Sequence, residues 1–298
     1  QHNAGYYAAP RPAGGCSYFG PTQAFIDAFQ CIDGKSIVES ELFDYKNPWK
    51  NRDPRLDLFC VRPGSRVYGF QFETDPSVEG GILVTNSEAS GTKSEYGANG
   101  AKGPAGYLWR KYVDISEYQL NGNSFGSKSK CVLNYPLMRL SELYLIRAEA
   151  NIELNIDLIK AKSDIELIRA RAKMPELTSV NQSDLRKALR YERMIELCNE
   201  GFRWFDLRRW NIAEDAISGT LYAPSFNGEL SNAKPIINEN YCVKYGIETF
   251  DGEKNNLRSF LEMRYDSLKD DLWPIPLDEI IGNPLIQQNP GYGSDQNE

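Results

Sequence analysis

The segment 190–210 combines a helical charge pattern, a glycine and a dense group of aromatic residues. Glu192, Glu196 and Glu200 recur at every fourth position, so a helix places all three carboxylates on one face. Like charges at this spacing repel by about 0.2–0.5 kcal/mol per pair unless cations face them. The pattern therefore predicts a helix here, with arginine side chains lying opposite its glutamate face.

Gly201 follows the helical pattern and can adopt the left-handed conformation that ends a helix. After it, arginines alternate with large aromatic side chains. We expect this part of the chain to fold back, so that its arginines pair with the glutamates and its tryptophans are buried beside them. The predicted pairs join Arg203 or Arg209 to Glu196 or Glu200, and the predicted buried rings are those of Trp204 and Trp210.

Composition argues against several classes of partner and site. The formal net charge is −7, whereas nucleic-acid binding needs clustered Lys and Arg, so we expect no nucleic acid as partner. No run of about 18 apolar residues is present, so no helix is predicted to span a membrane. The single histidine is His2 and no C-x-x-C pair occurs, so we predict no zinc site. We assign no metal ligands and no cofactor, and the sequence leaves calcium binding open. The six cysteines are expected to be mostly free and packed, with Cys198 as the clearest case.

The chain before residue 135 shows little periodicity. Residues 1–20 hold Gly, Pro and aromatic residues without a period and are predicted to be an irregular loop. Apolar residues at helical spacing behind Thr22, a good N-cap, predict a short helix within 21–33. The segment 21–134 is otherwise rich in turn residues, which indicates short β-hairpins and long loops.

Residues 137–210 are predicted to form a helical core. Helical spacing over 140–154 and again over 158–172, with a short break between, indicates two antiparallel helices. Their small alanines allow a close approach of the kind found in tetratricopeptide (TPR) pairs, although no repeat of about 34 residues is visible. Ser183 is expected to cap a third helix.

Residues 211–298 are interpreted as an insertion followed by a closing strap. Turn residues such as Asn227-Gly228 predict little regular structure over 211–271. Prolines at positions 274, 276, 284 and 290 predict an extended strap, because the residue before a proline avoids the helical conformation. Leu272, Trp273 and Ile275 are expected to pin this strap to the core.

Several short stretches resemble motifs of one family, in one order along nearly the whole chain. They are Pro21-Thr22-Gln23 with Asp33-Gly34-Lys35, Asn51-Arg52-Asp53-Pro54-Arg55, the segment 106–112, Pro136-Leu137 with Ala148-Glu149-Ala150, the segment 192–210, Trp273-Pro274-Ile275-Pro276 and Gln288-Asn289-Pro290-Gly291-Tyr292. On these residues the chain resembles the SusD/RagB family. The segment 192–210 is the most specific, since the family pattern there is ERxxEL-xxEG-xRWFDLxRW.

The resemblance implies a SusD-like fold that is mainly α. It would contain a TPR-like helical hairpin plus a further helix, with long loops and a few short β-hairpins. Family members are usually far longer, so residues 1–298 look like a C-terminal region, divided into 1–20, 21–134, 137–210 and 211–298. The missing N-terminal half would be a partner, and it would cover apolar surface that we expect to be exposed on the hairpin 137–173.

The resemblance also implies a function. The protein would be a non-catalytic subunit that captures a glycan or a glycan-derived nutrient for a SusC-like TonB-dependent transporter. It would lie on the cell surface, at the outer membrane of a Gram-negative bacterium, as a lipoprotein attached through sequence absent from this chain. Two other functions stay open: a surface module that binds protein or peptide, and a glycoside hydrolase. No motif predicts catalytic residues, since neither G-x-S-x-G nor a Walker loop is present.

A glycan site needs flat aromatic rings beside side chains that hydrogen-bond to hydroxyl groups, and loops present such groups best. The predicted ligand-binding residues are Tyr6, Tyr7, Tyr18, Phe19, Tyr68 and Tyr96. The loop before residue 21 is the first choice, because the family resemblance implies that loops there form part of the glycan surface. The element 51–55 and the charged residues of the segment 192–210 are expected to have structural roles.

Overall fold

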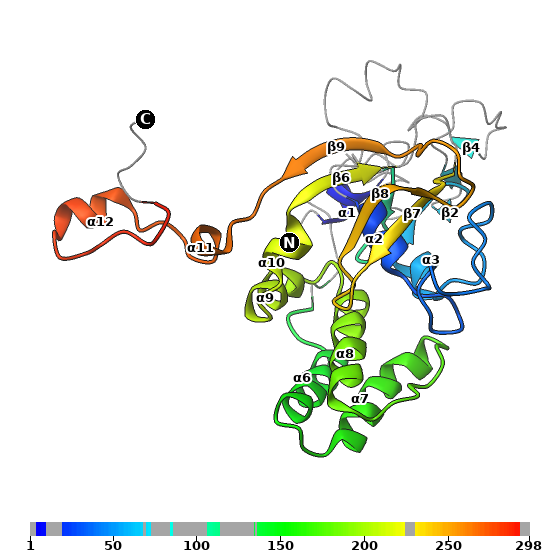
Figure 1. Cartoon of the computed structure of the whole chain (residues 1–298), viewed down its shortest axis with the longest axis horizontal. Helices are drawn as coiled ribbons and strands as arrows, with labels where there is room; N and C mark the ends of the chain where they lie inside the picture. The colour runs from blue at the N-terminus through cyan, green and yellow to red at the C-terminus, as the bar shows by residue number, and fades with distance from the viewer. Residues whose placement is uncertain are drawn as a thin grey trace.

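The computed structural model describes residues 4–9, 20–67, 70–72, 84–85, 106–113, 134, 136–223 and 230–292. In Figure 1 a helical body lies below a region of short strands and short helices, and a C-terminal arm extends away from both. The elements before the helical body are α1 (Ala4–Ala8), α2 (Gln23–Ala28), α3 (Arg55–Phe59), β1 (Cys60–Val61), β2 (Arg66–Val67), β3 (Phe70–Phe72), β4 (Val84–Thr85) and β5 (Leu108–Trp109).

The helical body consists of α6 (Leu140–Glu153), α7 (Leu158–Arg171) and α8 (Gln182–Glu196). The predicted helical hairpin is confirmed as α6 and α7, which pack on each other and on α8. Their connection turns at Asn155 and Asp157, whose φ angles are 54° and 44°, a region that Asn and Asp tolerate better than most residues. That the pair is TPR-like stays a prediction. The shared core contains Leu145, Ala148, Ile152, Ala161, Ile165, Ile168, Leu185 and Leu189.

The outer face of α6 is apolar and exposed. Leu140, Leu143 and Ile146 are 60%, 47% and 46% exposed, and Leu137 and Met138 just before the helix are also exposed. The exposed apolar surface predicted for the hairpin is therefore present. Single exposed leucines are ordinary, but a contiguous group of them marks a surface that packs against something.

The third helix begins earlier than predicted. Its N-cap is Asn181 rather than Ser183, since the Asn181 side chain accepts a hydrogen bond from the Asp184 amide at 2.9 Å. The first turn is also tied to the end of α6, because the Gln182 amide donates to the carbonyl of Ile152 at 2.6 Å. Asn and Ser are both good N-cap residues, and this contact with the end of α6 favours Asn181 over Ser183.

The N-terminal and turn-rich segments form short elements. The predicted helix behind Thr22 is confirmed as α2, with Thr22 Oγ1 accepting from the Phe25 amide at 3.2 Å. The predicted short strands are present as the antiparallel pairs β1–β5 and β2–β3, and β4 adds to β3 in parallel. Part of the segment 1–20, expected to be an irregular loop, is the helix α1. Burial of Ala8 and Ala9 stabilises this turn, a tertiary effect that no local period reveals.

Residues 219–263 contain regular strands, so the prediction of little regular structure there is wrong. Here β6 (Gly219–Ala223) pairs with β9 (Arg258–Met263), and between them in sequence β7 (Ala233–Ile237) pairs with β8 (Val243–Thr249), both antiparallel. β6, β7 and β9 show no apolar alternation in the sequence. β8 does alternate, with Val243, Tyr245 and Ile247 at every second position, but the turn residues around it outweighed that signal in the prediction. Contact with α2 positions them, and the Tyr245 hydroxyl donates to Asp27 Oδ2 at 2.6 Å.

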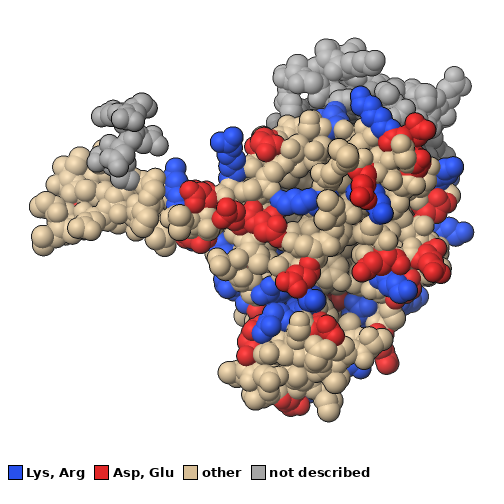
Figure 2. Space-filling model, in the orientation of Figure 1, with Lys and Arg blue, Asp and Glu red and all other residues tan. Residues whose placement is uncertain are grey.

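The described chain after residue 266 forms an arm that carries α11 (Ser267–Asp270) and α12 (Leu277–Gly282). Figures 1 and 2 show it projecting from the body with a mostly uncharged surface. Leu272 and Trp273 are 48% and 75% exposed, so the prediction that they pin a strap to the core is wrong. The predicted extended strap is also interrupted by α12, which begins directly after Pro276. The apolar side chains of the arm meet no core among the described residues.

The arm holds its own shape through side-chain amides. Gln288 accepts from the Ile275 amide at 2.7 Å and donates to the Ile275 carbonyl at 2.8 Å. Asn289 Nδ2 donates to the Trp273 carbonyl at 2.6 Å. These bonds close the outer part of the arm on itself, while the base of the arm is tied to the body by the Ser267 hydroxyl, which donates to Glu214 Oε2 at 2.9 Å.

Four cysteines, Cys31, Cys60, Cys198 and Cys242, are free and buried, as predicted. Burial raises the pKa of the Cys198 thiol to about 12, which makes it an unreactive core residue. Cys16 and Cys131 lie outside the described residues.

Candidate functional site

The glutamates at 192, 196 and 200 are buried in an ion-pair cluster, here called the glutamate cluster. Helix α8 ends at Glu196, so Glu200 lies in the turn after it rather than on the predicted helix. Glu192, Glu196 and Glu200 are 0%, 1% and 8% exposed. Cations do face them, as predicted, but the prediction that Arg203 or Arg209 supplies them is wrong. The cations are Arg55 at the start of α3, Lys111 after β5, Arg139 before α6, and Arg169 and Arg171 at the end of α7.

Two guanidinium groups bridge the three carboxylates. Arg55 Nη1 binds Glu192 Oε1 and lies 3.3 Å from Glu196 Oε2. Arg139 Nη1 binds Glu196 Oε1 at 2.6 Å, and its Nε binds Glu200 Oε2 at 2.8 Å. The repulsion along the helix is thereby replaced by charge-assisted hydrogen bonds.

The cluster shifts the pKa values of its carboxyl groups in opposite directions. Burial raises the pKa of Glu192, and the charge of Arg55 offsets this only in part. Burial acts the same way on Glu196, but hydrogen bonds and charges from Arg139 and Arg171 outweigh it, so that pKa is lowered. Perturbed carboxyl groups often mark catalytic sites. Here they bind guanidinium groups inside the core, so the cluster is structural.

The element 51–55 has the structural role predicted for it. Arg52 donates to the carbonyls of Ile26 and Phe29 at 2.6 and 3.0 Å, which satisfies the end of α2. Asp53 Oδ2 binds Arg55 Nη2 at 2.7 Å and orients that guanidinium toward α8. The buried cations therefore hold the turn-rich segment against the helical body.

A second charge network joins α6, α8 and α9 (Phe202–Arg209). Gly201 precedes α9 in a left-handed conformation, with φ of 86°, and redirects the chain toward α6. Arg193 Nε and Nη2 each bind Asp206 at 2.9 Å. Arg209 Nη2 binds Asp206 at 2.8 Å and Glu149 at 2.7 Å.

The tryptophans of this segment are more exposed than predicted. Trp204 is 38% exposed, and Trp210 is half-buried while its indole N–H donates to Glu149 at 2.6 Å. The short helix buries Asp206 and Leu207 instead. The guanidinium of Arg208 lies 5.6 Å from the centre of the Trp204 ring, a cation–π contact that holds the ring at the surface.

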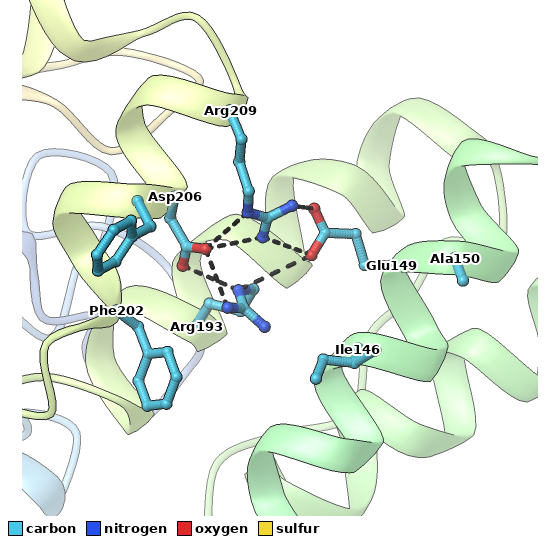
Figure 3. A pocket seen from close by; sticks show the side chains of 8 residues that line it. Ile146, Glu149, Ala150, Arg193, Phe202, Asp206 and Arg209 are labelled. Carbon is cyan, nitrogen blue, oxygen red and sulfur yellow. Dashed lines mark hydrogen bonds and ion pairs between the residues drawn. The ribbon is translucent and has the colours of Figure 1, made fainter. Parts of the chain in front are cut away.

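A pocket of about 460 Å³, here called the α6–α9 pocket, opens beside this network (Figure 3). Figure 3 shows the paired side chains of this network between α9 and α6, with Phe202 and Ile146 on opposite sides of the opening. Its two guanidinium groups and two carboxylates neutralise one another, so the pocket presents apolar side chains without net charge. It continues the exposed face of α6 and suits an apolar segment better than a charged ligand. The lining residues are Ile146, Glu149, Ala150, Arg193, Phe202, Phe205, Asp206 and Arg209.

A second pocket, here called the Tyr241 pocket, has a volume of about 340 Å³. It lies where the loop after α2, the loop between α7 and α8, and the loop between β7 and β8 meet. The hydroxyl of Tyr241 accepts from Gln30 Nε2 at 2.8 Å, and Tyr191 contacts the Tyr241 ring with centroids 4.6 Å apart. The sequence argument missed this pocket. Its one local signal was the Asn-Glu-Asn-Tyr turn at 238–241.

Neither a metal site nor a membrane-spanning helix occurs among the described residues. No group of His, Cys, Asp and Glu side chains among them could hold a metal ion. In the same part of the chain, no helix is both long and apolar enough to cross a membrane.

Comparison with known proteins identifies the family. The family model described as SusD family matches residues 1–292. The chain belongs to the SusD family. A SusD-like protein P2 of Formosa agariphila is 27% identical over 184 residues, which are 59% of this chain and 29% of that protein.

Solved structures show the same fold for this SusD-family chain. A SusD-like protein from Bacteroides fragilis has a TM-score of 0.64 at 24% identity, covering 98% of this chain and 50% of that one. A SusD-like carbohydrate binding protein from the same species has a TM-score of 0.65 at 23% identity, covering 95% and 51%. The fold is thus SusD-like, mainly helical with short antiparallel strands, and the chain spans about half the length of these structures.

Only two of the six predicted ligand-binding residues lie among the described residues of this SusD-family chain. Tyr6 and Tyr7 lie on α1, half-buried, with ring centroids 5.3 Å apart. Tyr18, Phe19, Tyr68 and Tyr96 fall outside the described residues. The two visible rings contact each other, and neither lines the α6–α9 pocket or the Tyr241 pocket.

Proposed function

We propose that this chain is the ligand-capturing part of a non-catalytic, cell-surface protein that receives a glycan or glycan-derived nutrient. The family match over residues 1–292 carries the proposal. A solved structure of the same fold is described as a carbohydrate binding protein, which favours a saccharide as ligand. The protein would deliver its ligand to a SusC-like TonB-dependent transporter and lie at the outer membrane of a Gram-negative bacterium, attached as a lipoprotein.

The charge arrangement supports binding without bond cleavage. The buried acids of α8, and Glu149 and Asp206 of the second network, each bind arginine or lysine. A glycosidase instead needs a raised-pKa carboxyl group and a second carboxylate facing a cleft about 5–9.5 Å apart. Glu192 has a raised pKa, but it is fully buried against Arg55.

Calorimetry of the complete native polypeptide against a panel of plant and host polysaccharides tests the proposal. Modest affinity is expected, about −4 to −6 kcal/mol, or Kd values from tens of micromolar to millimolar. We propose Tyr6, Tyr7, Tyr18, Phe19, Tyr68 and Tyr96 as contact residues, so Tyr18→Ala and Tyr68→Ala should each weaken binding. Unchanged binding in both variants would remove this site assignment. Binding to a peptide library, with no saccharide bound, would favour the protein-binding alternative.

We also propose that a further polypeptide segment, N-terminal in full-length relatives, covers the apolar face of α6 and the α6–α9 pocket. This chain covers about half of each solved relative, so those relatives contain a further segment that could correspond to the proposed one. Residues 1–298 would then act as one C-terminal region of a larger fold. The exposed Leu140, Leu143 and Ile146 provide the surface.

Cooperative unfolding tests this second part. Expressed alone, the 298-residue chain should bind a hydrophobic dye and melt with low cooperativity, because apolar surface of this extent is exposed. Co-expression with the proposed N-terminal segment should suppress dye binding and sharpen the unfolding transition. A monomeric, cooperative melt of the isolated chain without dye binding would contradict the proposal.

A further inference from the structure

Tyr241 adopts a backbone conformation that is unfavourable for an aromatic residue. Its φ is +55°, in the left-handed region, where a side chain costs about 1–2 kcal/mol and glycine or asparagine is usual. The turn does not need the ring, because Asn238 builds it: its Oδ1 accepts from the amides of Asn240 and Cys242 at 3.0 and 2.9 Å. Local strain of this kind is common where a side chain is presented to a ligand.

The strained backbone places the Tyr241 ring in one fixed position. Its hydroxyl accepts from Gln30 Nε2, and Gln30 Oε1 in turn accepts from Arg169 Nη1 at 3.3 Å. The backbone N–H of Gln30 donates to the Tyr191 hydroxyl at 3.0 Å, which fixes the Tyr191 ring that contacts Tyr241. The phenol is therefore held through its hydroxyl by Gln30 and through its ring by Tyr191, while the side chain stays partly exposed and lines the pocket.

The charged groups around the Tyr241 pocket balance. Its lining contains three acidic and three basic side chains, which sum to zero: Asp33, Glu176 and Asp184 against Lys35, Arg169 and Lys187. Of the basic groups, Arg169 is paired with Glu192 at 3.4 Å and Lys187 with Glu239 at 3.5 Å, so neither offers an uncompensated charge to an anion. The exposed Lys35 and Asp184 offer a donor and an acceptor at the rim. This arrangement favours a neutral ligand with several hydroxyl groups.

We propose that the Tyr241 pocket is a saccharide subsite, with Tyr241 as the ring on which a neutral sugar stacks. An apolar ring face beside paired donors and acceptors matches a sugar, which has C–H groups on its faces and hydroxyl groups at its edge. The volume of 340 Å³ is at the small end of ligand sites, which span about 300–1,000 Å³, so the subsite takes a short saccharide end. The inference rests on the proposed function and adds a position that the predicted rings do not include.

The test measures neutral oligosaccharide binding to the complete polypeptide by calorimetry, before and after Tyr241→Asn. Asparagine tolerates the left-handed backbone, so the turn is kept while the ring is lost. Affinity should fall at least about tenfold, which corresponds to roughly 1.4 kcal/mol. Tyr241→Phe keeps the ring and should retain binding to within about threefold. Tyr292→Asn, a tyrosine of the arm outside the pocket, is the matched control and should change nothing.

A second variant keeps the test decisive if Tyr241→Asn unfolds. Thr178 is exposed and lines the pocket, so Thr178→Arg fills its mouth without disturbing the core. It should weaken binding at least about tenfold and leave the thermal midpoint unchanged. Saccharide affinity that is unchanged in Thr178→Arg and in a folded Tyr241→Asn overturns the subsite and leaves the proposed function standing. Failure of every saccharide to bind the unmodified protein overturns both. Tighter binding of sulfated or uronic-acid saccharides than of neutral ones contradicts the neutral ligand class.

Discussion

The glutamate cluster and the C-terminal arm depart from the usual distribution of side chains in opposite ways. In the cluster, three acidic side chains are buried in the core. In the arm, large apolar side chains such as Trp273 and Leu285 are 75% and 89% exposed. Burial of the acids is stable because several cations contact them, whereas exposure of the arm reflects the lack of a partner surface among the described residues. Burial thus depends on available partners as well as on polarity.

The largest expected effect tests the buried side of this comparison. Arg55→Ala should lower the free energy of unfolding by about 3–5 kcal/mol, because it leaves Glu192 buried and poorly compensated. Urea unfolding of the complete polypeptide measures the change. Arg186→Ala, which removes a partly exposed pair with Glu153, is the control and should cost less than about 1 kcal/mol. Equal, small losses in both variants would show that the cluster contributes no more than a surface pair.

A smaller effect concerns pH. The folded-state pKa of Glu196 lies below its ordinary value of 4.5, so its contribution to stability is present above that value. It is lost as the pH falls through the folded-state pKa, when protonation breaks the bonds to Arg139 and Arg171. Glu196→Gln should therefore be less stable at neutral pH and lose less stability on acidification than the unmodified protein.

Glu192 provides the internal contrast for this measurement. Its folded-state pKa is raised, so protonation is easier in the folded protein and its contribution grows as the pH falls. Glu192→Gln should therefore steepen the loss of stability on acidification, while Glu196→Gln makes it shallower. Unfolding free energies measured from about pH 7 down to pH 3 separate the two variants. Identical slopes in both would contradict the opposite shifts.

The smallest expected effect tests the exposed side. Trp273→Ser should change the free energy of unfolding of the complete polypeptide by no more than about 0.5 kcal/mol, because the ring contacts no core among the described residues. Leu145→Ala, in the core shared by α6, α7 and α8, should cost about 2–5 kcal/mol in the same chemical denaturation. A loss above about 1 kcal/mol for Trp273→Ser would mean that the arm packs on the body in solution.

Local patterns predicted the elements that carry their own signal. The Thr22 cap, the break between α6 and α7, and the buried apolar positions of α7 are all legible within a few residues. The strands β6, β7 and β9 were missed because they carry no apolar alternation, whereas β8 does alternate but lies among turn residues that outweighed its signal. Of the candidate site, the sequence suggested aromatic rings in loops but not the Tyr241 pocket, which joins residues up to 211 positions apart, such as Gln30 and Tyr241.

The sequence by itself determined the family, the helices α2, α6, α7 and α8, and the need for cations opposite the glutamates at 192, 196 and 200. Helical spacing and the repulsion between like charges are properties of neighbouring residues, so they can be read from the chain. Only the tertiary structure decided which cations bind them, Arg55 and Arg139 rather than Arg203 or Arg209. Ion pairing depends on distances between atoms from separate segments, and many arginines meet the same local requirement. For the same physical reason the arm is exposed, since burial of Trp273 requires a surface that local sequence does not specify.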